Sequence, residues 1–143
     1  MGLDAVVYMN KLNLGIDQLG DSLQIDEQTG EVYPTPGDGL VRPAQIFTAI
    51  HRRLGNASMI GSLASEISLV LDANSILLKR VLYRSSHSGD RIEVDDLSNL
   101  ESEINLVRQR TKDAQSGELD TFLTALAELI DAAKHEKNPI VFT

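Results

Sequence analysis

The chain has 143 residues, a formal net charge of −8 and no cysteine, and this length predicts one domain over residues 1–143. The missing cysteines exclude disulfides, thiolate metal sites and a cysteine nucleophile, and the negative charge disfavours binding to nucleic-acid phosphates. Without a signal-like N-terminus or a long apolar run, we expect a cytoplasmic protein that does not enter a membrane.

The first quarter of the chain is predicted to form strands. Residues Asp4 to Met9 are apolar and β-branched, which is typical of a strand. In Leu23–Tyr33, two apolar stretches flank the polar run "DEQTG", and its Gly30 can take a positive φ, so we expect a β-hairpin there. The following Pro34–Gly39 holds two prolines and two glycines and is expected to be a loop.

The apolar spacing then becomes helical, and two successive helices are predicted. The first starts at Pro43 and ends at Gly55. Its inner face consists of Ile46, Phe47, Ile50 and Leu54, and its outer face of the basic cluster His51, Arg52 and Arg53. Asn56 caps the second helix. The inner face of that helix consists of Ile60, Leu63, Ile67 and either Val70 or Leu71.

Residues 75–84 are ambiguous, because a short apolar run fits a buried strand as well as a helix. A helix capped by Asn74 is favoured. The short "RIEV" after the polar loop reads as extended. A helix then starts at Asp95 or Asp96, with acidic residues first and basic residues last, which complements the helix dipole. Its inner residues are Leu97, Leu100, Ile104 and Val107.

The C-terminal region carries the clearest helical pattern, after a break at "KDAQSG". Apolar residues recur at steps of three and four: Leu119, Phe122, Leu123, Leu126, Leu129, Ile130 and Ala133. Asn138-Pro139 ends this helix, and "IVFT" reads as a closing strand. Together the elements predict an α+β fold. A small antiparallel sheet from the N-terminal strands, which the C-terminal strand can join, packs against four or five helices.

The loop "YRSSHSGD", Tyr83 to Asp90, contains serine, histidine and aspartate, the residue types of a hydrolase triad. Triad residues normally come from well-separated parts of a chain, and no G-x-S-x-G signature surrounds these serines. Ser, Gly and Asp all favour turns. We therefore expect a structural turn, with a partner-contact loop as the second interpretation and a catalytic site as the least favoured.

No pattern predicts a metal or a cofactor. The histidines His51, His87 and His135 are scattered and form no metal-ligand spacing. Gly37-x-Gly39 is followed by Arg42 where a dinucleotide-binding motif needs its third glycine. We expect no catalytic residues, no metal and no cofactor.

The segment "DRIEVDDLSNLESE", Asp90 to Glu103, has six acids and one base. Such a segment suits docking onto a basic protein, because charge raises the association rate and an aromatic residue can anchor the contact. The predicted partner-binding residues are Tyr83, His87, Asp90, Glu93, Asp95, Asp96 and Glu101. The alternative is a solvated helix start, since acids commonly occupy the first helical turn.

Four stretches resemble bacterial immunity proteins, the small proteins encoded beside polymorphic or contact-dependent toxins. They are "MGLDAVVY", "RLGNASMIGSLASEI", "LYRSSHSGD" and "NPIVF". The resemblance implies a short, acidic α+β protein that binds and occludes one cognate toxin, often a basic nuclease, without catalysis. It assigns no site residues.

The expected function is therefore that of a cytoplasmic immunity-type protein with a basic toxin as its partner. Two alternatives stay open. One is a self-associating regulatory or structural module, a homodimer with the apolar C-terminal helix partly at its interface. The other is a carboxylate-dependent enzyme, which needs a deep pocket that holds two acids together with His87.

Overall fold

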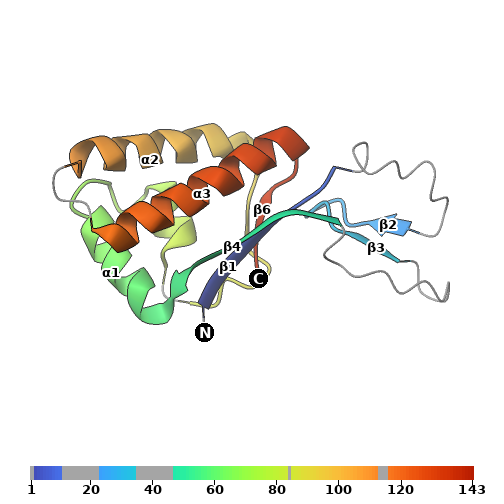
Figure 1. Cartoon of the computed structure of the whole chain (residues 1–143), viewed down its shortest axis with the longest axis horizontal. Helices are drawn as coiled ribbons and strands as arrows, with labels where there is room; N and C mark the ends of the chain where they lie inside the picture. The colour runs from blue at the N-terminus through green and yellow to red at the C-terminus, as the bar shows by residue number, and fades with distance from the viewer. Residues whose placement is uncertain (1, 11–22, 35–46, 84, 113–115) are drawn as a thin grey trace.

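The computed structural model describes residues 2–10, 23–34, 47–83, 85–112 and 116–143 (Figure 1). Its strands are β1 (Gly2–Tyr8), β2 (Leu23–Ile25), β3 (Val32–Pro34), β4 (Thr48–Asn56), β5 (Arg91–Ile92) and β6 (Ile140–Phe142). Its helices are α1 (Ala57–Ile67), α2 (Leu97–Arg110) and α3 (Gly117–Glu136), with a π-helical turn η5 (Leu77–Val81) and a 3₁₀ turn η6 (Val94–Asp96). The described residues form an α+β fold, as the sequence predicts.

The main sheet is antiparallel, with strand order β4-β1-β6-β5. The C-terminal strand β6 joins it beside β1, as expected, and pairs Ala5 with Phe142. The hairpin β2–β3 is confirmed but forms a separate two-stranded sheet. In Figure 1 this hairpin lies at the end of the molecule away from α1.

The helices cover one face of the main sheet. Helix α3 packs across β1 and β4, and α2 packs against α3. Alternate residues of β1, Leu3, Ala5 and Val7, belong to the core, as period-two alternation requires. The seven apolar residues predicted for the inner face of α3 are all buried there. The apolar face of this helix, through which the alternative of a homodimer would partly associate, is therefore packed inside the core.

The helix predicted from Pro43 to Gly55 is wrong where the structure describes it. Residues Thr48–Asn56 form strand β4, which pairs with most of β1 and places Ile50 opposite Val7. Pairing with β1 gives hydrogen-bond partners to the backbone along one edge of the segment, and this tertiary gain overrides the local helical spacing. The predicted start at Pro43 and most of the predicted loop before it lie outside the described residues.

Arginine at a sheet edge hides the strand pattern of β4. Arg52 stands on the same face of the sheet as Ile50, and its Nε donates to Glu128 of α3 at 2.6 Å. Leu54, two residues further along the strand, lies on the same face and belongs to the core. The basic cluster is thus not the outer face of a helix. It is split between the two faces of an edge strand, with Arg53 lying 3.7 Å from Asp4 on the other face.

Helices α1 and α2 start where the sequence predicts, although only the start of α1 has a side-chain cap. The Asn56 side chain accepts a hydrogen bond from Met59 N at 2.9 Å and begins α1. Helix α2 begins directly after Asp96. Helix α3 ends at Glu136, where Lys137 takes the left-handed conformation with φ 56° just before Asn138-Pro139. These boundaries come from local chemistry and are therefore readable from the sequence.

In the described part of the ambiguous segment, residues 75–83, one helical turn forms rather than a strand, as the favoured alternative predicts, but Asn74 does not cap it. The carboxylate of Glu103, on α2, does. Its Oε2 accepts from Ile76 N at 3.0 Å and its Oε1 from Leu77 N at 3.2 Å. A turn as short as η5 is only marginally stable by itself. The distant carboxylate therefore holds this turn in place.

The hairpin turn sits against the end of α3. Gly30 has φ 79°, as expected, and its N–H donates to Asp26 O at 2.8 Å. Asn138 occupies the space beside Gly30, and its Nδ2 donates to Tyr8 O at 2.8 Å. Burial raises the pKa of Tyr8, and the nearby negative charges of Glu31 and Asp26 add to that effect. The turn, β1 and α3 thus meet at one point.

The C-terminal end of α3 also holds the chain as it leaves β1. Glu136 is buried, and its Oε2 accepts from Asn10 N at 2.7 Å. Asn10 Nδ2 donates in turn to Glu136 O at 2.8 Å. A buried carboxylate is stabilised by hydrogen bonds of this kind. The last turn of α3 therefore positions the strand exit as well as the hairpin.

Candidate binding surface

The loop that contains "SSHSGD" is a packed turn. The rings of Tyr83 and His87 lie 3.9 Å apart between centroids, and His87 meets Phe142 edge-on at 5.7 Å. Gly89 takes φ 88°, and its N–H donates to Phe142 O at 2.9 Å. Phe142 N donates back to Asp90 O at 2.8 Å. The histidine is thus used as a packed aromatic ring between the loop and β6, in a turn as the residue types predict.

His87 is held in its neutral form by its surroundings. Burial lowers its pKa, and the carbonyls of Val81 and Ser85 oppose that shift. The Nε2 atom is buried and has no hydrogen-bond partner among the described residues. Burial therefore disfavours a proton on this ring more than the two carbonyls favour it.

His87 predicts a loss of stability in mild acid. Because the pKa of His87 is lower in the folded state, the unfolded chain takes up the proton first as the pH falls below about 6.5. The stabilisation is complete above that pH and is lost as the pH falls through the folded-state pKa. Urea unfolding at about pH 7.5 and about pH 5 should show a larger loss for the wild type than for His87→Gln. Equal losses of stability in the wild type and the variant would contradict the lowered folded-state pKa of His87.

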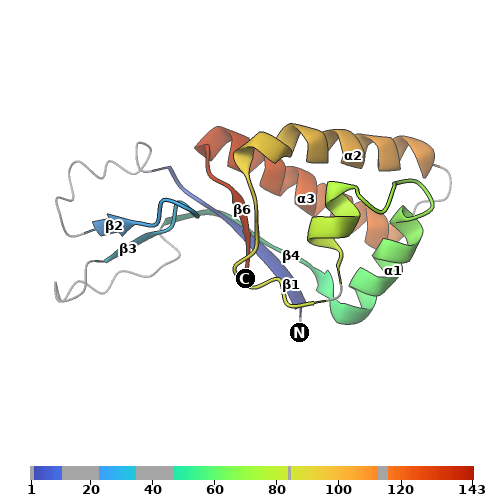
Figure 2. The ribbon, with the colours of Figure 1, turned by 180° about the vertical axis from the view of Figure 1, so that it is seen from behind.

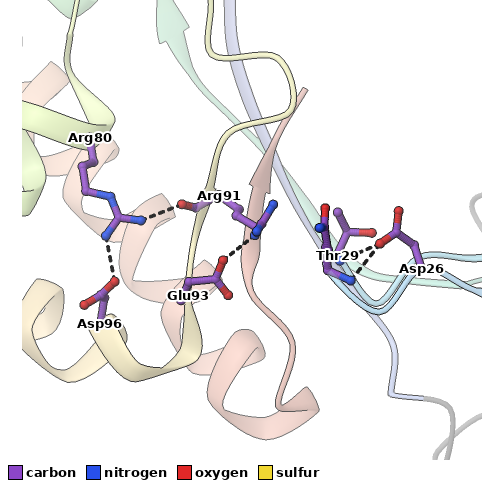
Figure 3. Close-up of polar contacts among 7 residues, drawn as sticks. Asp26, Thr29, Arg80, Arg91, Glu93 and Asp96 are labelled. Atoms are coloured by element: carbon purple, nitrogen blue, oxygen red, sulfur yellow. Dashed lines mark hydrogen bonds and ion pairs between the residues drawn. The ribbon is translucent and has the colours of Figure 1, made fainter.

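Several of the predicted acidic residues are paired within the chain. Arg80 Nη1 donates to Asp96 Oδ2 at 2.7 Å, and its Nη2 donates to Arg91 O at 2.9 Å (Figure 3). Arg91 pairs with Glu93. These contacts link η5, β5 and the start of α2. Asp96 is therefore part of the fold's own charge network, and its carboxylate is already partly neutralised.

Glu101 lies apart from the other predicted residues. Its carboxylate accepts from Lys134 Nζ at 3.1 Å and so joins α2 to α3. Tyr83 and Asp90, in contrast, line one small hollow of about 310 Å³ together with Lys79, Arg80 and Arg91. The structure thus brings Tyr83, His87 and Asp90 together, and leaves Glu101 in a separate interhelical pair.

One paired acid, Glu93, and one unpaired acid, Asp95, flank the exposed side chain of Val94. Asp90 and Asp95 are exposed and form no ion pair within the described part of the chain. Val94, between Glu93 and Asp95, is 39% exposed, and Leu69 is the one other large apolar residue described as exposed. We call Asp90, Glu93, Val94 and Asp95 the acidic surface.

Sequence reasoning missed two residues here. Val94 was taken as part of an extended alternation, but strand β5 ends at Ile92 and Val94 begins the 3₁₀ turn η6. Its position between two acids is the signal that it faces solvent. Glu103 was counted among the helix-start acids, yet it caps a distant turn. No local signal marks that role, because its partners lie 26 and 27 residues away.

The described residues contain no group of three or more histidine and acidic side chains arranged to hold a metal ion. Within the same residues, no helix has both the length and the apolar character needed to cross a membrane.

Comparisons with known proteins give no match: no protein-family model fits the chain, and no curated protein or solved structure is significantly similar to it. The candidate site thus rests on its own geometry.

Proposed function

We propose that this protein is a non-catalytic, immunity-type protein that binds and neutralises a basic bacterial toxin. The observation that carries the proposal is the acidic surface, in which exposed Val94 lies between the exposed acids Glu93 and Asp95. The net charge of −8 and the resemblance of four stretches to immunity proteins agree with it. The partner is a basic protein, and this chain acts by occluding the surface on which the toxicity of that partner depends.

The two kinds of side chain have different roles in such a complex. Asp90 and Asp95 attract a basic partner over a distance comparable to the Debye length and so raise the association rate. Val94 gives an apolar point that is desolvated on contact and slows dissociation. Glu93 keeps its pairing with Arg91 and adds to the negative field. Binding should therefore weaken as salt is added.

The first test is co-expression with the genes that neighbour the chain's own gene. We expect one neighbouring product, with a basic domain, to arrest growth and this protein to restore it. The purified pair should form a stoichiometric complex whose affinity falls with salt. The proposal fails if no neighbouring product is toxic, or if toxicity persists with this protein folded and abundant.

The charge-reversal double variant Asp90→Lys, Asp95→Lys should slow association by about tenfold or more at low salt, and should flatten the salt dependence. Neither acid has an ion-pair partner in the described residues, so the fold should persist, which circular dichroism can verify. The matched control is Glu27→Lys, Asp131→Lys, which changes the net charge equally at exposed positions elsewhere. Equal slowing in both variants would assign the effect to overall charge and not to the acidic surface.

A further inference from the structure

Strand β4 forms the long edge of the main sheet. It has nine residues and pairs with β1 on one side, and no other described strand pairs with its opposite side. The strand at the other edge of the sheet, β5, has only two residues. In Figure 2 β4 and β6 lie on opposite sides of β1. A free edge presents main-chain N–H and C=O groups with which an added strand can pair.

Hydrogen bonds on the far side of β1 show which residues of β4 turn their main chain outward. Asp4 O accepts from Thr143 N at 3.0 Å, so the main chain of Asp4 faces β6. Successive residues of an antiparallel strand turn their main-chain groups to alternate sides. The main chain of Ala5 therefore faces β4, where Ala5 is paired with Arg52. The two residues that flank Arg52 consequently face the free edge.

These outward residues are His51 and Arg53, and both are exposed. His51 O accepts from Arg52 Nη1 at 2.9 Å, which leaves the two N–H groups and the Arg53 carbonyl for an added strand. Bulges and charges commonly protect an edge from pairing. The register shifts of β4 against β1 lie on either side of the stretch from Ile50 to Arg53, which keeps a regular register. The charges therefore decide which strand can be added.

The centre of β4 is basic in a chain whose net charge is −8. His51, Arg52 and Arg53 follow one another, and β4 contains no acid. The arginines pair with Glu128 and Asp4, but these ion pairs are partly exposed to solvent, and such pairs contribute little energy. A carboxylate on an added strand can therefore share the two arginines.

A second copy of the chain fits this edge poorly. The antiparallel register that uses the main chains of both His51 and Arg53 places Arg52 opposite its own equivalent in the second copy. Like charges that lie directly opposite each other in a strand pair are destabilising. An acidic strand has the reverse effect, because its carboxylates meet cations. Charge therefore favours an acidic strand over self-pairing.

We propose that β4 binds an extended, acidic segment of a partner protein, which adds to the main sheet as a further antiparallel strand. The side chains of His51 and Arg53 lie on the sheet face away from the helices, 3.8 and 3.7 Å from the Asp4 carboxylate. Acids occupy the positions opposite these two residues. The positions between them point to the other face, beside the partly buried Ile50, and take apolar residues. This inference is independent of toxin binding, because β4 and the acidic surface share no residue.

The test uses the whole chain and a short peptide of alternating glutamate and valine with blocked ends. We expect NMR amide shifts along β4 and a dissociation constant of about 1 mM or tighter. The same peptide with lysine in place of glutamate should bind about tenfold more weakly. N-methylation separates strand addition from charge attraction. Methylated glutamates should abolish binding, because their nitrogens face β4, whereas methylated valines should leave it unchanged.

Variants locate the added strand. His51→Pro removes an outward N–H but keeps the pairing with β1, since proline is tolerated in an edge strand where its nitrogen faces solvent. It should abolish peptide binding in a protein that circular dichroism shows to be folded, while His51→Ala, which keeps the N–H, should retain binding. Arg53→Gln should weaken binding about threefold. The matched control Arg110→Gln, at an exposed position at the end of α2, should leave it unchanged.

The proposal is overturned if the glutamate peptide does not bind, if the lysine peptide binds as tightly, or if the two methylated peptides bind equally. A folded His51→Pro protein that still binds would overturn it as well. Sedimentation at several concentrations tests the other occupant of the edge. A dimer that His51→Pro dissociates would overturn the proposal in favour of a second copy of the chain.

Discussion

Replacing Gly30 by alanine is expected to lower the free energy of unfolding by about 3 kcal/mol. The residue has φ 79°, a conformation that costs about 1–2 kcal/mol for a residue with a Cβ. The new Cβ would also lie within 2.5 Å of Nδ2 of Asn138. Asn138 cannot turn away cheaply, because that same nitrogen donates to Tyr8 O.

Gly89 provides the matched control for this variant. It has φ 88°, yet a Cβ there would meet nothing within 4 Å. Gly89→Ala should therefore show the backbone cost alone, about 1 kcal/mol. Urea unfolding followed by circular dichroism gives both values. If the two variants lost the same free energy of unfolding, the contact between the hairpin turn and Asn138 would make no contribution to the stability of the fold.

Replacing Glu103 by alanine is expected to cost about 3 kcal/mol. Its carboxylate accepts two backbone hydrogen bonds, from Ile76 and Leu77, at the start of η5. Without it, two partly buried amide donors lose their partner, and the turn is left without its main anchor to α2. The residues after η5 form the packed loop at Tyr83 and His87. The loss should therefore also broaden or shift the NMR signals of that loop.

Glu101→Ala serves as the control on the same helix. Its carboxylate forms an exposed pair with Lys134, and such pairs contribute at most about 1 kcal/mol. Glu103→Gln should lie between the two variants, because an amide keeps one acceptor oxygen and loses the charge. Equal, small losses for Glu103→Ala and Glu101→Ala in urea unfolding would show that η5 forms without its carboxylate cap.

The candidate surface was only partly readable from the sequence. The excess of acids between Asp90 and Glu103 is visible in the residue order, and so is the turn chemistry of the loop before it. Which acids remain available depends on partners elsewhere in the chain: Arg80 pairs with Asp96, and Lys134 pairs with Glu101. These pairings span the fold, so no local pattern separates Asp95 from its neighbour Asp96.

Local chemistry determined the α+β class, the hairpin turn at Gly30, the cap at Asn56 and the long amphipathic helix α3, because each depends on residues a few positions apart. The tertiary structure alone decided that Thr48–Asn56 is a strand. Its apolar spacing fits a helix, but the backbone of β1 offers it hydrogen-bond partners along one edge. The cap on η5 by Glu103 was likewise decided by two distant segments that folding brings together.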